Sequence, residues 1–433
     1  MNARISQLNS DGRGSPPMKQ RVLRWRRPER KWTSSRPPPR MRAGRENVAA
    51  AGSMRSSLLL FLGIFNLLTI SSRGAAPNED IDRLLDPIRK QHDLPALAAA
   101  VVQGGRTVAI GAVGFRKYGE HVKVTSADPF HIGSCTKSMT ATLIGLLVEQ
   151  GRLSWDTTIA NVFPELSSSM QPQYQDVTLE QLLSHRGGFP HETLPPGKTF
   201  PDLHNLPGTR REQRRAYLEL ALRSPPEARP GEKHIYSNMG YVVAGAMAEK
   251  AMNASWEDLM TRMLFKPLGM TSAGFGAMGT PGKIDQPWQH TLEGTNHHAI
   301  APGPRSDNPP VIGPAGTVHC SLGDWAKYAA VHVRGETNRV GLLKPETFRK
   351  LHTPMFGGDY AFGWGVANRN WGGGRVLTHN GSNNQNFAVV WMAPLRDFAV
   401  LVATNQGGDE AAKACDETAA ALITEFLASR KRD

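Results

Sequence analysis

The chain has 433 residues, 39% of them hydrophobic, and a net charge of +13. This length supports one large or two ordinary domains with a sizeable core. Residues 1–53 hold thirteen Lys/Arg and three Asp/Glu, and Arg55 and Arg73 add two further positive charges, so the rest of the chain is near +1. Because the positive charge is confined to one end, it does not indicate a nucleic-acid partner for the folded part.

Two patterns occupy the N-terminal end. Residues 1–53 are rich in Arg, Pro and Ser and have too few apolar residues to fold, which predicts a disordered basic extension. From Met54 the chain has a basic start, an apolar run over 58–70 and small residues at 74–76, so 54–76 is predicted to be a secretory signal peptide. We expect translation to start at Met54, leaving the extension untranslated; a peptide from 1–53 in the purified protein would contradict this.

The apolar run has thirteen residues, whereas a membrane-spanning helix needs about 20. A removed export signal is therefore favoured, and we expect the mature protein to be exported, in the periplasm or outside the cell. The alternative is an uncleaved anchor with the basic extension on the cytoplasmic side. Only in that case would the protein contact a membrane.

The elements expected in the remaining chain begin with a helix over 78–92. Two apolar stretches, 96–103 and 106–119, are separated by Gly104 and Gly105 and predict a β-hairpin. The run from Ser134 to Gln150 predicts a helix that is apolar nearly all round, which implies burial, with Gly151 at its end.

Short helical segments and long loops follow over about 153–351, and the longest loop, 279–316, is expected to form a rim or cover. Four strands are predicted next, and a helix over 409–428 ends the chain. The fold class is therefore α/β (α+β), in which an antiparallel sheet formed by the N- and C-terminal segments is flanked by helices and a mainly helical region is inserted. The predicted strands are 361–369, 375–381, 386–394 and 398–406.

Metal and cofactor sites find little support. Cys135, Cys320 and Cys415 are too far apart in the sequence for a zinc cluster and too few for a disulfide framework, so we expect three small buried side chains. His297 and His298 stand in a Pro/Gly-rich loop, where we expect them to be solvated. No G-x-S-x-G, no H-E-x-x-H and no complete phosphate loop occurs.

The stretch HIGSCTKSMTA, residues 131–141, places Ser134 and Lys137 three apart at the start of the apolar helix. Residues three apart share a helix face, so the lysine can reach the serine hydroxyl. A lysine accepts a proton from serine only if its pKa falls from about 10.4, and burial in an apolar helix would lower it. Taken alone, the pair is weak evidence, because a serine that caps a helix and a solvated lysine explain it better than a catalytic pair does.

Two further motifs follow in order, Tyr236-Ser237-Asn238 and His379-Asn380-Gly381. With these the chain resembles the β-lactamase and penicillin-binding-protein family, in the branch of class C β-lactamases, D-Ala-D-Ala carboxypeptidases and related esterases. The stretches VTLEQLLSHRGGFP and LFKPLGMTSAGFG are also similar to family landmarks. The resemblance covers about 78–427 and implies that 77–433 is a single catalytic domain with the helical insertion at about 153–351.

The resemblance implies a role for each motif residue. Ser134 would be the acylated nucleophile, and Lys137 its proton acceptor or the group that keeps Tyr236 deprotonated. Tyr236 would act as general base, and Asn238 would orient the substrate and the lysine. The backbone N–H groups of Ser134 and Ser382 would form an oxyanion hole, where one donor is typically worth about 3 kcal/mol of barrier. We also expect the buried lysine and phenol to draw each other's pKa toward neutrality, and no metal or cofactor is implied.

The third motif departs from the Lys-Thr-Gly of many family members. His379, next to Gly381 and Ser382 in the expected substrate-binding strand, would be mostly neutral at pH 7 and would hold a substrate carboxylate weakly. Esters, amides and D-amino peptides therefore become as plausible as β-lactams, which carry that carboxylate.

The resemblance leaves two functions open. The first is an exported serine hydrolase that acts through an acyl-serine intermediate on small-molecule or peptide substrates. The second is a non-catalytic penicillin- or peptide-binding cell-wall protein. Oligomeric state is left open, and Trp364, Trp371 and Phe189 are candidate pocket-lining aromatics for which core packing is the more ordinary role.

Overall fold

A six-stranded antiparallel sheet organises the part of the chain that the computed structural model describes, residues 79–337 and 341–428. Its order is β2-β1-β11-β10-β9-β8, so strands from both ends of the described chain pair directly, with Leu97 opposite Thr404. The predicted basic extension and signal peptide lie outside these residues. The strands are β1 (Ala96–Gln103), β2 (Arg106–Gly114), β8 (Gly365–Arg369), β9 (Gly374–Ser382), β10 (Phe387–Ala393) and β11 (Phe398–Thr404).

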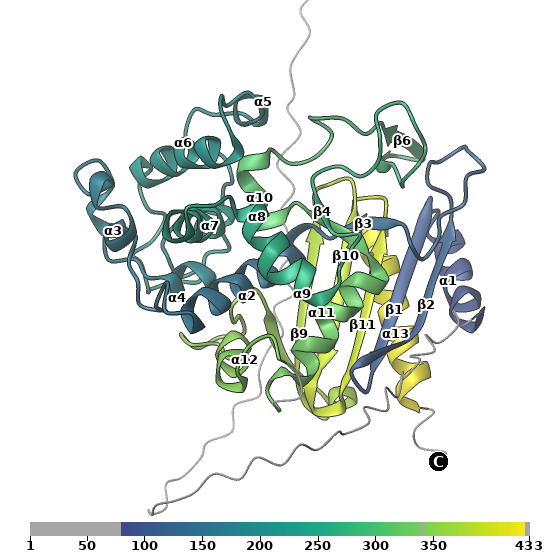
Figure 1. Ribbon diagram of the computed structural model, residues 1–433. Helices are drawn as coiled ribbons and strands as arrows, with labels where there is room; N and C mark the ends of the chain where they lie inside the picture. Colours follow the sequence, from purple (N-terminus) through teal and green to yellow (C-terminus); the bar gives the residue numbers. More distant parts are fainter. Residues whose placement is uncertain (1–78, 338–340, 429–433) are drawn as a thin grey trace, which may run out of the picture. The chain divides into compact units, whose positions relative to one another are not determined.

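Both faces of the sheet are covered, as alternate residues of β1 show. Leu97, Ala99 and Val101 belong to a core shared with helices α1 (Glu79–Gln91) and α13 (Asp409–Ala428). Ala98 and Ala100 point the other way, into a larger core shared with α11 (Leu322–Gly335) and the helical region. Figure 1 shows α1 and α13 on one side of the sheet and α11 on the other. A strand buried on both faces explains the unbroken apolar run of β1.

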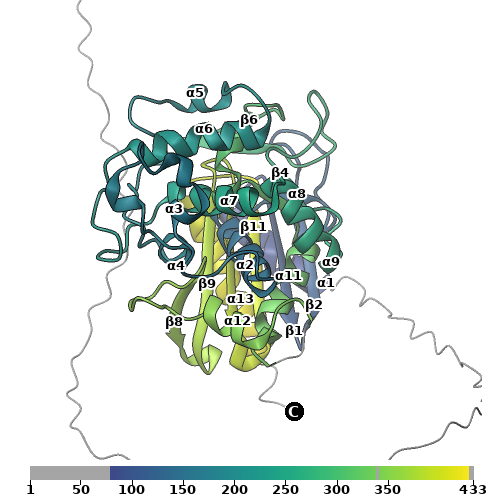
Figure 2. The same ribbon diagram turned by 60° about the vertical axis from the view of Figure 1, so that its left-hand side comes forward.

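The helical region stands beside the sheet (Figures 1 and 2), and α2 (Thr136–Glu149) lies between the two. Twelve of the fourteen residues of α2 are buried, which agrees with its apolar sequence. The remaining helices are α3 (Ile159–Val162), α4 (Leu179–Leu183), α5 (Phe200–His204), α6 (Arg210–Arg223), α7 (Asn238–Met252), α8 (Trp256–Met260), α9 (Lys266–Leu268), α10 (Gly313–Gly316) and α12 (Pro345–Leu351).

The predicted fold class is confirmed: the sheet is antiparallel, is built from both ends of the described chain and is flanked by helices. Two local expectations need correction. The helix expected from Ser134 begins at Thr136, after a 3₁₀ turn over Gly133–Cys135. The loop expected over 279–316 contains the hairpin β5 (Gln289–Glu293) and β6 (Asn296–Ile300) as well as α10, because buried Gln289 and His290 anchor it. A small third sheet joins β3 (Pro129–His131), β7 (Val318–Ser321) and β4 (Gly274–Phe275).

The cysteines and the histidine pair are placed clearly. Cys135, Cys320 and Cys415 are buried free thiols, as expected. The adjacent histidines lie on β6 rather than in a loop, and the His297 side chain is buried between Asp93 and Gln406, so the expectation that it is solvated is wrong. The His298 side chain is exposed, as expected. Within the described ranges, no group of three or more His, Cys, Asp or Glu is placed to hold a metal ion, and no helix is long and apolar enough to cross a membrane.

Candidate active site

Ser134 lies in a tight turn where α2 meets strand β9. The N–H of Thr136 donates to the carbonyl oxygens of Gly133 and Ser134, which closes the turn directly onto α2. Gly133 has φ +50°, and a Cβ atom there would lie 2.4 Å from the backbone nitrogen of Ser382. Only glycine satisfies both conditions. The Gly-Ser pair therefore places the half-buried serine in the 3₁₀ turn that leads into the buried helix α2, against the sheet.

Lys137 is fully buried one turn further along α2. Its Nζ lies 3.0 Å from Ser134 Oγ, 2.7 Å from Asn238 Oδ1 and 2.8 Å from the carbonyl oxygen of Ala315. Because burial opposes the charged form, the pKa of Lys137 falls to about 7. A neutral amine has two hydrogens and one lone pair. The two carbonyl oxygens, one from an amide side chain, take the hydrogens, and the lone pair then faces the serine hydroxyl.

Tyr236 completes the group of side chains around Ser134. Its phenol is hydrogen-bonded to the Ser134 side chain, and the Lys137 Nζ lies 4.7 Å from the ring centroid. Burial raises the pKa of Tyr236 well above its ordinary value, although the bond to Ser134 opposes the rise. The expectation that its pKa moves toward neutrality is therefore wrong, because a lysine that sheds its own charge gives little support to a phenolate. Tyr236 stays protonated near neutral pH.

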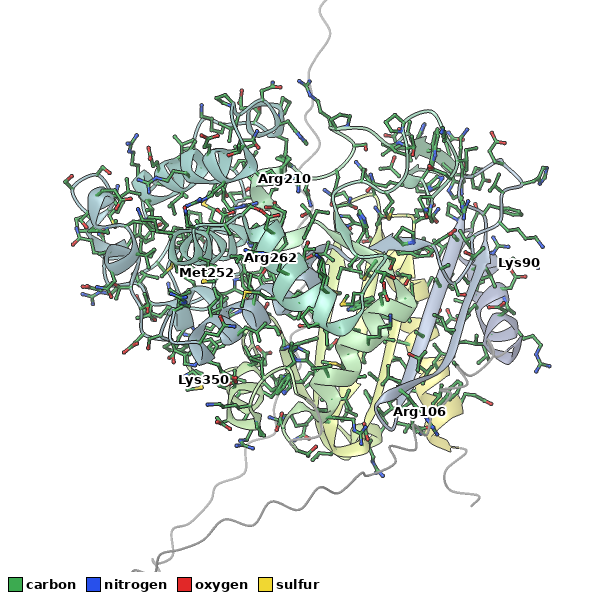
Figure 3. The ribbon with its side chains drawn as sticks, viewed as in Figure 1. Lys90, Arg106, Arg210, Met252, Arg262 and Lys350 are labelled. Carbon is green, nitrogen blue, oxygen red and sulfur yellow. The ribbon has the colours of Figure 1, made fainter. Side chains whose placement is uncertain are left out.

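Asn238 is the first residue of α7, whose far end is marked by Met252 in Figure 3. Its amide oxygen accepts from Lys137, and its Nδ2 donates to Thr193 Oγ1 at 2.7 Å. The preceding segment is held by buried His185, whose Nδ1 accepts from the Ser237 N–H at 3.0 Å and whose ring lies 4.3 Å from that of Tyr236. The Tyr-Ser-Asn motif thus enters the site in one fixed orientation.

Strand β9 lies directly against the turn that carries Ser134. A Cβ atom on Gly381 would lie 2.1 Å from the carbonyl oxygen of Ile132 and 2.5 Å from the backbone nitrogen of Ser134. The glycine therefore permits two backbones to approach at van der Waals distance. This approach brings the backbone amides of Ser134 and Ser382 together, which is the arrangement that an oxyanion hole requires.

His379 precedes Gly381 on β9 and is buried. Its Nδ1 lies 2.5 Å from the carbonyl oxygen of Asn380, and its Nε2 lies 3.0 Å from the hydroxyl of Tyr360. These partners assign the hydrogen to Nδ1 and leave Nε2 to accept from the tyrosine. Burial, followed by the nearby Lys137 charge, lowers the pKa of His379 to about 3. The imidazole is thus neutral at pH 7, and its lone pair is already occupied.

The structure brings together all seven predicted site residues; their roles stay predictions. Two of the three candidate aromatics, Trp364 and Phe189, are core residues, and Trp371 packs on Trp391 and Phe398 in the core shared with α1 and α13. Sequence reasoning missed four partners. One of them, His185, lies inside a stretch noted only as a family landmark. The other three are brought to the site by tertiary folding, which no short sequence motif predicts. The four are Thr193, His185, Ala315 and Tyr360.

The fold and this cluster define a serine-hydrolase architecture of the β-lactamase type, and comparisons with known proteins agree. The model of the family described as Beta-lactamase matches residues 81–425. The chain therefore belongs to the β-lactamase family. The family comprises serine hydrolases that act on small-molecule or peptide substrates.

Among curated relatives, penicillin-binding protein 4 of Amycolatopsis lactamdurans is 28% identical over 350 residues, covering 74% of this chain and 84% of the relative. An unguisins hydrolase of Aspergillus campestris is 24% identical over 344 residues, covering 76% of this chain and 61% of the relative. Among solved structures, an octameric penicillin-binding protein homologue from Pyrococcus abyssi is 23% identical, with a TM-score of 0.65 and coverage of 80% of this chain and 77% of that one. These structural likenesses support the fold alone.

Proposed function

We propose that the protein is an exported serine hydrolase that forms an acyl-enzyme on Ser134 and prefers neutral esters or amides to substrates with a free carboxylate. Export rests on the secretory pattern at 54–76. The observation that carries the chemistry is the geometry of Lys137: a buried amine with a pKa of about 7 lies 3.0 Å from the serine hydroxyl. An amine in this position can activate the Ser134 hydroxyl as the nucleophile that acyl transfer needs.

In the proposed acylation step, the lone pair of Lys137 takes the proton of the Ser134 hydroxyl while the oxygen attacks the carbonyl carbon. The carbonyl oxygen becomes an anion beside the N–H groups of Ser134 and Ser382. When the tetrahedral intermediate collapses, the leaving group takes a proton from Tyr236, and the proton held by Lys137 restores the phenol. The products of this step are the acyl-serine and a neutral alcohol or amine.

Deacylation repeats these proton movements with water in place of the leaving group. Lys137, again neutral, takes a proton from the water that attacks the acyl carbonyl, and Ser134 leaves with a proton returned through the same pair. A lysine with a pKa near the working pH suits both directions, because it accepts and releases a proton at similar cost.

The substrate preference rests on His379. A free carboxylate on the substrate would meet a neutral imidazole whose Nε2 accepts from Tyr360, so neither a positive charge nor a free donor faces it from this residue. β-Lactams and peptide C-termini carry such a carboxylate. The partial match to an unguisins hydrolase agrees with a hydrolase that is not restricted to β-lactams.

A substrate panel tests the proposal. The purified protein is expected to hydrolyse a short-chain nitrophenyl ester with a higher kcat/KM than a chromogenic cephalosporin, and Ser134→Ala is expected to hydrolyse neither above the solvent rate. His379→Lys, which restores a cation on β9, is expected to raise the cephalosporin-to-ester ratio of kcat/KM by about tenfold, the effect of about 1.4 kcal/mol.

The opposite ranking, with the cephalosporin preferred by the wild type, would contradict the interpretation of His379. Binding of a penicillin without any turnover of the panel would instead favour the alternative, a non-catalytic penicillin- or peptide-binding protein. Nothing in the geometry of Ser134, Lys137 and Tyr236 favours that alternative, since both Lys137 and Tyr236 contact the Ser134 side chain.

A further inference from the structure

A buried chain of hydrogen bonds joins the two segments that carry the proposed oxyanion hole. On the nucleophile side, the N–H of Gly133 donates to Nδ1 of His131 at 3.1 Å. Since Nδ1 accepts, Nε2 carries the ring hydrogen and donates to Asp307 Oδ2 at 2.9 Å. Both side chains are buried, with 0% of His131 and 4% of Asp307 exposed. The turn before Ser134 is thus tied to a carboxylate.

The same carboxylate is tied to the β9 side. Asn383 follows Ser382 directly, and its Nδ2 donates to Asp307 Oδ1 at 2.7 Å. The Asn383 amide also contacts Gln289 and Asn386, and the Ser382 hydroxyl donates to the carbonyl oxygen of Asn386 at 2.7 Å. One oxygen of Asp307 therefore accepts from Asn383, which adjoins Ser382, and the other from His131, which holds the N–H of Gly133 just before Ser134.

We infer that Asp307 is a positioning residue for the reaction: the bridge His131–Asp307–Asn383 sets the distance and orientation of the Ser134 and Ser382 N–H groups. The inference rests on the proposed function, because it assigns these amides to an oxyanion. Asp307 comes from the segment between β6 and α10, which is part of the stretch expected from sequence to be a rim. That segment thereby supports the turn that carries Ser134, through His131.

The hydrogen-bond partners of Asp307 explain why its carboxylate stays ionised although it is buried. Burial opposes ionisation of Asp307, but His131 and Asn383 outweigh it and hold the pKa of this carboxyl below its ordinary value. An ionised carboxylate accepts from both sides at once. An asparagine there has only one acceptor oxygen, and its NH₂ would face the N–H of His131 or the NH₂ of Asn383. Asp307→Asn is therefore nearly isosteric but removes one of the two hydrogen bonds of the bridge, either to His131 or to Asn383.

The test compares Asp307→Asn with Asp324→Asn. Asp324 is a similarly buried carboxylate whose partners are Ser272 and Lys327, so its loss reports the general cost of removing such a group. For a nitrophenyl ester we expect Asp307→Asn to lower kcat 10- to 100-fold with KM within threefold of wild type. Displaced N–H groups in the oxyanion hole stabilise the transition state less, whereas they affect ground-state binding of the substrate little. Affinity for phenylboronic acid, whose tetrahedral adduct places an oxygen in the hole, should fall by a similar factor. Asp324→Asn should keep both values within threefold.

A second variant separates positioning from folding. His131→Asn keeps an acceptor near the Gly133 N–H but does not reach Asp307, so it should reproduce the kcat loss. The double variant should be no slower than the slower single variant, because both changes cut one bridge. Asp307→Asn with kcat and boronate affinity equal to those of Asp324→Asn would overturn the inference.

Hydrogen–deuterium exchange gives a readout that needs no turnover. In Asp307→Asn, peptides covering Gly133–Cys135 and 382–386 should both exchange faster than in wild type, whereas Asp324→Asn should leave them unchanged. Unchanged protection in both peptides would contradict the bridge. If wild type shows neither hydrolysis nor reaction with a fluorophosphonate, the proposed function fails, while the exchange result still decides whether Asp307 orders the two segments.

Discussion

Replacing Lys137 with methionine is expected to lower kcat/KM for an ester substrate about 10³-fold or more, because it removes the proposed proton acceptor of Ser134. Methionine fills a similar apolar volume on α2, so the helix is expected to keep its packing. Asn238 Oδ1 and the Ala315 carbonyl lose a donor, which is expected to cost about 1–3 kcal/mol each if water does not replace it. Steady-state kinetics and thermal unfolding measure both effects.

Lys250→Met is the matched control. Lys250 lies in the last turn of α7, is about half exposed and pairs only with Glu165 among the ion pairs of the described residues. Its replacement should leave kcat/KM within twofold of wild type. Retention of more than a tenth of wild-type activity by Lys137→Met would show that another group accepts the serine proton.

Arg214→Ala is expected to cause the largest loss of stability, about 3–5 kcal/mol in the free energy of unfolding. Arg214 is fully buried on α6 and is bonded to Glu249 of α7 and, at 2.7 Å, to Glu257 of α8. It also donates to the carbonyl oxygens of Pro310 and Val311, in the segment that leads to Ala315. Truncation leaves two carboxylates buried without their cation, and it loosens the carbonyl that faces Lys137.

The neighbouring residue supplies the control, since Arg215 is a third exposed and pairs with Glu165 and Glu219 at the surface. Arg215→Ala should cost less than about 1 kcal/mol. Arg210, at the start of the same helix (Figure 3), is also exposed and lies 3.8 Å from Glu257, too far to replace the lost bonds. Equal denaturation midpoints for the two alanine variants would contradict the assigned role of the buried cluster.

The sequence predicts the fold well where periodicity and family motifs agree. Helix α13 has the bounds that its apolar pattern gave, and the hairpin around Gly104 and Gly105 forms as expected. The hairpin β5–β6 was missed because its residues are polar and flanked by Pro and Gly. Its stability comes from tertiary contacts, such as Asn383 and Asn386 on Gln289, and a sequence window does not contain these.

In the candidate site, too, the sequence predicts the motif residues but not the features that depend on tertiary contacts. Ser134, Lys137, Tyr236 and Asn238 come from motifs, and the burial that lowers the lysine pKa could be inferred from the apolar helix. The rise in the pKa of Tyr236 was not foreseen, since it depends on how completely the phenol is enclosed. Asp307 gave no signal at all, because its partners are 176 and 76 residues away along the chain.

The pH dependence of fluorophosphonate labelling tests most directly whether a neutral Lys137 activates Ser134. A fluorophosphonate carries no carboxylate, so its reaction rate reports the nucleophile and not the contacts of His379. Because the neutral amine is the reactive form and its fraction rises with pH, labelling should increase about tenfold per pH unit well below 7 and level off above about 8. Mass spectrometry should place the label on Ser134 and find none on Ser134→Ala. A rate that is flat from about pH 5 to 9, or equal labelling of Ser134→Ala, would contradict the account.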